Sequence, residues 1–192
     1  MKKWFKDLTE LVGSDQLVRI KRKAKFDDTF DGYIVGVNES FVMLHILCDD
    51  TMVLDGYTVL RTADIRRVYF SNENKSFLNR ALKLKGLTAI PQPEIALSDY
   101  PALLKSVNER FPLFTIEQEI KYPGMCFIGK IAKLTQKKLT LDEIDPNAQW
   151  SQTHPFKLKH ITRVDFGDGY GEALNLVSTH EAALKAPEEP RA

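Results

Sequence analysis

The chain contains two similar halves, and this internal repeat constrains its fold more than any other feature of the sequence. The segment Ile65–Phe70 (IRRVYF) resembles Ile161–Phe166 (ITRVDF) at a separation of 96 residues (161 − 65). Upstream, Gly32–Ile34 falls on Gly129–Ile131 at a separation of 97, so one single-residue gap aligns the two halves. A repeat of this length predicts one supersecondary unit that is built twice.

Each half has the pattern of a helix followed by five short strands. Apolar and basic side chains alternate with period two in residues 18–26, which predicts a strand with one inward face. The predicted strands are 18–26, 32–37, 41–47, 57–61 and 65–70 in the first half, and 114–122, 127–134, 138–144, 154–159 and 161–166 in the second half. Five short strands joined by tight turns are typical of a small barrel.

Apolar residues at helical spacing flank each set of strands. The first helix is predicted over about 4–12, and its counterpart in the second half begins after Ser98 as the N-cap, with Pro101 in the first turn. Further helices are predicted over 75–85 and about 172–184. We therefore predict a mainly β fold with flanking helices (α+β), made of tandem duplicated five-stranded small barrels.

The repeat also predicts the domain boundaries. Residues 1–88 are expected to form a helix, the first small barrel and a second helix, residues 89–97 a Pro-containing linker, and residues 98–185 the second helix-plus-barrel copy. Residues 186–192 are expected to be a disordered tail. The prolines of the linker make it stiff, so the two copies are expected to keep a fixed relative orientation.

Composition and charge argue against several classes of function. The formal net charge is only +1, so the chain lacks the global basic field of a general nucleic-acid binder. No apolar run approaches the roughly 18 residues of a membrane span, and the first residues lack the apolar stretch of a signal peptide. Cys48 and Cys126 occupy non-equivalent positions in the two copies. We therefore expect free thiols in a reducing compartment, and hence a cytoplasmic protein without a membrane partner.

Two segments of the first copy resemble the motifs of the Sm and Sm-like family of RNA-associated proteins. Gly32–Leu44 (GYIVGVNESFVML) is similar to the family's strand-turn-strand motif, and Leu60–Val68 (LRTADIRRV) to its Arg-Gly motif with the following strand. Asn38 stands where the family has an aspartate, Val42 where it has a base-contacting asparagine, and Thr62 where it has the glycine. The resemblance implies Sm-like small barrels and makes RNA a candidate ligand.

The second copy departs further from the family. Thr135 takes the first polar position, and Lys157-Leu158 takes the place of Arg-Gly. The first copy, from Asp31 through Tyr57 to Arg61, also looks similar to a set of uncharacterised bacterial proteins. The chain thus resembles an uncharacterised bacterial protein with two Sm-like repeats, and this likeness implies no activity.

The predicted first strand carries a row of basic residues on its outward face. The row consists of Arg19, Lys21, Lys23 and Lys25. Its neighbours are expected roughly 6.6–6.8 Å apart, close to the spacing of successive phosphates on an extended nucleic-acid strand. At the equivalent positions, the second copy has Thr115, Glu117, Glu119 and Lys121.

Three interpretations of these rows stay open. In the first, the basic row binds a polyanion such as RNA, and the phosphate contacts come from Arg19, Lys21, Lys23, Lys25, Arg61 and Arg67. In the second, the two rows face each other, within the chain or across a dimer, and fix docking by charge. In the third, the charges only protect an edge strand from aggregation.

No constellation of residues predicts catalysis or a cofactor. His45 and Cys48 would point to opposite faces of a strand, so no metal site is predicted there. The glycine-rich segment Gly167–Gly171 lacks the Lys-Ser/Thr of a phosphate loop. We therefore predict a non-catalytic binding or assembly module that engages protein partners or itself. RNA or single-stranded nucleic-acid binding through the basic first strand is the alternative, and a small-molecule or signalling role through a cleft between the two copies is the third candidate.

The predicted helix 75–85 and the strand before it carry more apolar residues than one small helix covers. These residues are Phe70, Phe77, Leu78, Leu82 and Leu84. Any that stay exposed would mark a surface for a protein partner or a homodimer.

Overall fold

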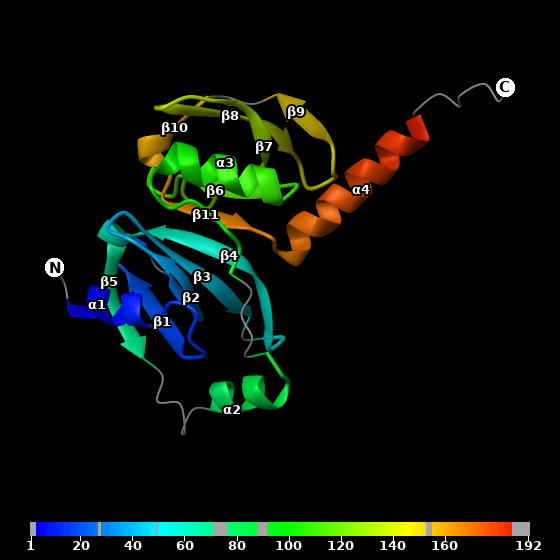
Figure 1. Cartoon of the computed structure of the whole chain (residues 1–192). Helices are drawn as coiled ribbons and strands as arrows, with labels where there is room; N and C mark the ends of the chain where they lie inside the picture. The colour runs from blue at the N-terminus through cyan, green and yellow to red at the C-terminus, as the bar shows by residue number, and fades with distance from the viewer. Residues whose placement is uncertain are drawn as a thin grey trace.

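The computed structural model describes residues 3–26, 28–48, 50–70, 77–87, 92–152 and 155–185 (Figure 1). The helices are α1 (Lys3–Glu10), α2 (Phe77–Leu84), α3 (Tyr100–Arg110) and α4 (Gly169–Lys185). The strands of the first half are β1 (Leu17–Arg22), β2 (Thr29–Val37), β3 (Phe41–Cys48), β4 (Val53–Arg61) and β5 (Ile65–Phe70). Those of the second half are β6 (Phe114–Glu117), β7 (Cys126–Leu134), β8 (Lys138–Ile144), β9 (Trp150–Gln152), β10 (Phe156–Lys157) and β11 (Arg163–Phe166). Short 3-10 turns precede β5 and β11, namely η1 (Thr62–Asp64) and η2 (Leu158–His160).

The strands form one open antiparallel sheet. Its order is β10-β8-β7-β6-β11-β4-β3-β2-β1-β5, and β9 also pairs with β8. The mainly β fold with flanking helices is thereby confirmed. The sheet differs from the two separate small barrels that were predicted, because β4 of the first half pairs with β11 of the second half and joins the halves edge to edge.

The two halves repeat the same strand registers. Val18 lies opposite Gly32 in the first half, and Phe114 lies opposite Gly129 in the second half. Both halves also carry a register shift at the same place, after Ile34 in β2 and after Ile131 in β7. These pairings reproduce the separations of 96 and 97 residues, so the alignment of the two sequence repeats is confirmed in the strands.

A glycine is required at the same place in both halves. A Cβ atom built on Gly32 would lie 2.3 Å from the carbonyl oxygen of His45, and one built on Gly129 would lie 2.1 Å from that of Asp142. Real Cβ atoms essentially never approach backbone this closely. The second strand of each half can therefore lie this close to the backbone of the third only because it has no side chain at that position.

Two strands end earlier than their alternating pattern predicts. β1 stops at Arg22 and β6 stops at Glu117. In the first half, a register shift between Lys21 and Arg22 bends the ladder with β5. The chain then turns, and the N–H of Phe26 donates to the carbonyl of Lys23 at 2.8 Å.

The helices cap equivalent positions of the two halves. Leu8 of α1 and Leu104 of α3 are both fully buried and stand at the same place in the repeat. The N-cap of α3 is Asp99, whose carboxylate accepts from the N–H of Ala102 at 2.8 Å, rather than the predicted Ser98. An aspartate is an equally good cap, and Pro101 lies in the first turn as predicted.

The remaining helices lie outside the sheet. In Figure 1, α4 lies beside the second half, which it contacts through a hydrogen bond from Trp150 to Ser178, and α2 lies at the far end of the first half. α4 begins at Gly169, earlier than predicted, because Asp168 accepts from the N–H of Gly171 at 2.8 Å and caps the first turn. Within the described residues, no helix is long and apolar enough to cross a membrane.

One hydrophobic cluster spans both halves. It includes Phe41 and Val59 from the first half together with Leu104 and Val164 from the second half. The described end of the linker packs against the same cluster through Leu97. The two halves therefore share a core as well as a sheet.

Candidate binding site at the free sheet edge

The last strands of the two halves have different surroundings. β11 lies between β6 and β4, whereas β5 ends the sheet and pairs only with β1 among the described strands. Ile20 lies opposite Val68 in the first half, as Ile116 lies opposite Val164 in the second half. β5 is therefore the counterpart of β11 with one side left open.

The β4–β11 junction defines which backbone groups pair across the halves. The N–H of Thr62 donates to the carbonyl of Ser40, on the β3 side, at 2.9 Å. Backbone groups point to alternate sides along a strand, so Val59, three residues earlier, points its N–H and C=O at β11. It lies opposite Val164 there. By the same register, Val68 and Phe70 present their backbone groups to the open side of β5.

The opposite end of the sheet is blocked by a proline. The N–H of Leu158 donates to the carbonyl of Lys137 at 3.0 Å, as Thr62 does in the first half. Alternation then places Pro155, the counterpart of Val59, with its backbone nitrogen on the outer side. Proline has no N–H to donate, so this edge lacks one of the donors that β4 offers to β11.

The predicted strand 154–159 is shorter in the structure. β10 (Phe156–Lys157) and the beginning of η2 lie within this range, whereas β9 (Trp150–Gln152) lies before it, and the two strands pair with different parts of β8. Residues 153–154 lie outside the described residues, and His154 is one of them.

Charges at equivalent positions differ in sign between the halves. Glu117 lies opposite Arg163, and their charged groups are 2.6 Å apart. The equivalent pair next to the open edge is Lys21 opposite Arg67, two cations. Like charges directly opposite one another on a sheet are destabilising. The open edge thus holds a surplus of positive charge.

Tyr69 lies within this positive charge. Arg67 Nη1 donates to its hydroxyl oxygen at 3.4 Å, and the Arg67 guanidinium lies 5.7 Å from its ring centroid. The hydrogen bond from Arg67, followed by the charges of Arg67, Lys21 and Arg66, lowers the pKa of Tyr69. The phenol is 44% exposed, so a partner can reach it.

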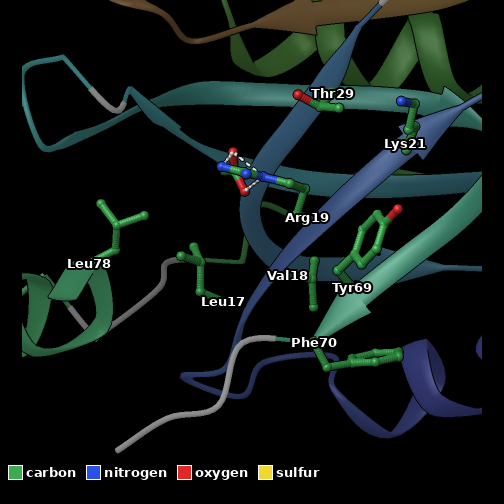
Figure 2. A pocket seen from close by; sticks show the side chains of 9 residues that line it. Leu17, Val18, Arg19, Lys21, Thr29, Tyr69, Phe70 and Leu78 are labelled. Atoms are coloured by element: carbon green, nitrogen blue, oxygen red, sulfur yellow. Dashed lines mark hydrogen bonds and ion pairs between the residues drawn. The ribbon is translucent and has the colours of Figure 1, made fainter. Parts of the chain in front are cut away.

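A groove of about 500 Å³ runs beside β5 (Figure 2). Its lining includes Leu17, Lys21, Tyr69, Phe70 and Leu78. In Figure 2, Tyr69 and Phe70 project from β5, and Leu78 of α2 lies on the far side of the groove. Phe70 is 39% exposed, so an apolar ring remains accessible directly at the free edge.

The apolar residues around α2 differ in how far they are buried. Leu82 is fully buried, whereas Phe77 and Leu84 are 70% and 90% exposed. Phe70 is exposed as well, so three of the five residues in this apolar set lie at the surface, where a partner could contact them.

The predicted basic row does not form one strip. Arg19 is held by Asp31 through three hydrogen bonds of 2.7–3.0 Å. Lys23 and Lys25 lie beyond the end of β1, and Lys25 forms an ion pair with Asp64 at 3.3 Å. The turn that follows β1 is the physical reason, because it takes Lys23 and Lys25 out of the strand on whose alternation the row depended.

Arg61 and Arg67, the other predicted contacts, lie apart from each other. Arg61 pairs with Asp64 at the end of β4, and Arg67 lies on β5. The predicted set is thus divided between the β5 edge, with Lys21 and Arg67, and the turns beside η1, with Lys25 and Arg61.

A fully buried arginine that does not belong to the basic row links the two halves. Arg22 is 0% exposed, bonds Asp28 and Glu119, and lies 4.2 Å from the ring centroid of Phe26. Burial alone would lower its pKa, but the hydrogen bonds and charges of Asp28 and Glu119 raise the pKa above the usual value. Of the three interpretations, charge docking within the chain gains this one contact, made through Glu119 of the second row. The cation in this contact, Arg22, does not belong to the basic row.

The second half buries its own charged cluster. Burial raises the pKa of Glu117 to about 7, against the opposing charge of Arg163. Asp165 accepts from the hydroxyl of Thr58 in β4 at 2.6 Å and from Arg163 at 2.7 Å. These contacts show how β11 satisfies its polar side chains once a strand covers it.

The described residues contain no group of three or more histidine, cysteine or acidic side chains that could hold a metal ion. His45 stacks on Tyr57 with ring centroids 4.4 Å apart, and burial lowers its pKa. Cys48 and Cys126 are free thiols.

Comparisons of the chain with protein-family models, with curated proteins and with solved structures find no match. The Sm-like resemblance therefore stays a prediction from the motifs.

Proposed function

We propose that this protein is a non-catalytic binding module that takes an extended, acidic segment of a protein partner as an additional strand on β5. The observation that carries the proposal is that β5 repeats the register of β11 but, among the described residues, lacks a covering strand such as β4 provides for β11. Main-chain hydrogen bonds would supply affinity, and pockets for alternate side chains would supply selectivity.

The β4–β11 junction serves as an internal template for such a complex. In that junction, Val59 lies opposite the inward-facing Val164, and Thr58 donates to the outward-facing Asp165. On β5 the inward position is Val68 and the outward positions are Arg67 and Tyr69. An added strand would therefore place apolar residues inward and acidic residues outward.

A protein partner accounts for the open edge better than a second copy of the chain does. Head-to-tail addition would need the edge at which Pro155 stands without a donor. Two-fold pairing of β5 with β5 would bring Arg66 and Arg67 of both copies together. An acidic segment instead neutralises Lys21 and Arg67, which repel each other in the free protein.

The test uses the full chain and two labelled eight-residue peptides, one alternating valine with glutamate and one alternating valine with lysine. Fluorescence anisotropy should show that the glutamate peptide binds at least about tenfold more tightly. Phe70→Pro removes an outward N–H at the strand end and should weaken binding about tenfold, whereas Phe70→Ala keeps the N–H and should cost less.

Charge variants provide a second readout of the same proposal. Lys21→Glu with Arg67→Glu should reverse the preference between the two peptides. Lys130→Glu with Lys133→Glu on β7 changes the net charge equally and should leave the preference unchanged. Equal affinity of the two peptides, or equal loss in the Phe70→Pro and Phe70→Ala variants, would overturn strand addition.

Single-stranded nucleic acid is the second candidate, because an exposed aromatic ring among cations suits base stacking and phosphate contacts. Tyr69 with Lys21 and Arg67 is such a group. An oligonucleotide that displaces the glutamate peptide, and whose affinity falls in a Tyr69→Ala variant but not in Phe70→Pro, would favour this alternative.

A further inference from the structure

A second surface, separate from β5, gathers basic side chains from both halves. A hollow of about 410 Å³ is lined by Lys25, Arg61, Ile120, Lys121, Lys159, His160 and Thr162. Lys25 comes from the turn after β1 and Arg61 from the end of β4, both in the first half, and the other five come from the second half. The hollow therefore exists only because the β4–β11 junction brings the halves together.

The lining carries more positive charge than its neighbours neutralise. Lys25 and Arg61 share one carboxylate, Asp64, which is almost fully buried behind them. Lys121 and Lys159 have no ion-pair partner among the described residues, and neither aspartate nor glutamate lines the hollow. Four cations thus stand around one recess with a single carboxylate between them.

The imidazole of His160 responds to the same concentration of charge. Its pKa is lowered by burial and then by Lys159, Lys121 and Lys157. The lowered pKa favours the neutral imidazole, which offers a hydrogen-bonding group rather than a charge. The positive charges that disfavour a proton on His160 would favour a bound anion at the same place.

A neighbouring hollow extends the basic surface. It measures about 470 Å³ and is lined by Gln136, Lys137, Lys138, Lys157, Leu158 and Lys159. The two hollows share Lys159, so an anion larger than one phosphate group could contact both.

We propose that the first hollow binds a compact small molecule that carries two or more phosphate groups. Lysine ammonium groups and the arginine fork are the side chains that suit phosphate oxygens. The volume lies in the range of small-molecule sites. Among the described residues, no Phe, Tyr or Trp side chain lines either hollow, and the imidazole of His160 is the single aromatic ring there, so the row of stacking rings of a single-strand nucleic-acid groove is missing.

The test is calorimetric titration of the full chain with inorganic orthophosphate, pyrophosphate and triphosphate. Affinity should rise along this series, with triphosphate at least about tenfold tighter than orthophosphate. Lys121→Ala with Lys159→Ala should weaken triphosphate binding about tenfold or more. Lys105→Ala with Lys133→Ala removes two exposed lysines elsewhere and should leave the affinity unchanged.

Further titrations separate the sources of the phosphate groups. Tighter binding of ATP than of triphosphate would identify a nucleotide, and equal binding would identify an inorganic oligophosphate; both support the site. Equal loss in the two double variants would overturn it. Tighter binding of a single-stranded RNA 12-mer than of triphosphate would also overturn the proposal of a compact ligand, if the salt dependence of the RNA affinity shows that more than about three phosphates are neutralised.

Discussion

The two halves share the registers of their first three strands and of their last strand, but they differ strongly in what surrounds that last strand. β11 is covered on both sides and satisfies its charges with Glu117 and Thr58. β5 has the same register but one open side, and it places Arg67 opposite Lys21. The repeat therefore contains both the covered and the uncovered form of one strand. The covered form indicates what the uncovered one lacks.

The comparison extends to two arginines on β1. Arg19 and Arg22 both make hydrogen bonds to an aspartate, but Arg19 lies at the surface of one half whereas Arg22 is buried between the halves and reaches Glu119. The Arg19–Asp31 contact lies within the first half, whereas the Arg22–Glu119 contact requires both halves.

The largest expected effect is therefore the loss of Arg22. Arg22→Met leaves Asp28 and Glu119 without their shared cation and should lower the free energy of unfolding by about 3–5 kcal/mol. Arg19→Met, which breaks a largely exposed pair, should cost less than about 1 kcal/mol. Urea denaturation measures both, and similar losses in the two variants would contradict the role of Arg22 between the halves.

A pH effect should distinguish the covered strand from the open one. Glu117 has a pKa of about 7 in the folded protein, above its ordinary 4.5, so the folded state binds the proton more tightly. Its contribution to stability is complete below pH 4.5 and is lost as the pH rises to about 7, by up to about 3 kcal/mol. Glu117→Gln should remove this part of the pH dependence of unfolding.

Lys21→Gln is the matched control, since Lys21 is the counterpart of Glu117 in the first half. This variant should keep the wild-type pH dependence between pH 4.5 and 7. An unchanged profile in Glu117→Gln would show that the raised pKa does not act on stability.

The glycines of β2 and β7 test the equivalence of the halves. Gly32→Ala and Gly129→Ala both place a methyl group against a backbone carbonyl and should each cost about 1–3 kcal/mol. Lys133→Ala, in an exposed position of β7, should change stability by less than about 0.5 kcal/mol. A large loss of stability at only one of the two glycines would show that the two positions are not structurally equivalent.

The smallest effect on stability is expected at Pro155. Pro155→Val restores an N–H to the outer edge and should change the free energy of unfolding by less than about 0.5 kcal/mol. It should also introduce concentration-dependent association, measured by sedimentation, because this edge could then pair with β5 of another copy. Adding Phe70→Pro to Pro155→Val should suppress the association.

Much of the backbone could be predicted from local patterns. The strands at 65–70 and 138–144 have the predicted bounds, and the repeat alignment predicts the registers of both halves. The period of two also placed Arg22 on the inward face, where it lies. The ends of β1 and β6 were wrong, because a register shift and the following turns override the alternation.

The binding surfaces were less predictable than the strands. Lys21 and Arg67 were predicted from the basic row and the second motif, and they do face each other on the sheet. The clustering of Lys121 and Lys159 with Lys25 and Arg61 was missed. No local spacing could have indicated it, since the residues come from turns of different halves.

By itself, the sequence determined that one unit is built twice, because glycine positions, apolar alternation and turn residues recur at a fixed separation and act over a few neighbouring residues. Only the tertiary structure decided that β4 covers β11 and leaves β5 open. Both strands offer the same backbone groups to a partner, so the choice depends on long-range packing of the shared core and on the burial of Arg22 against Glu119.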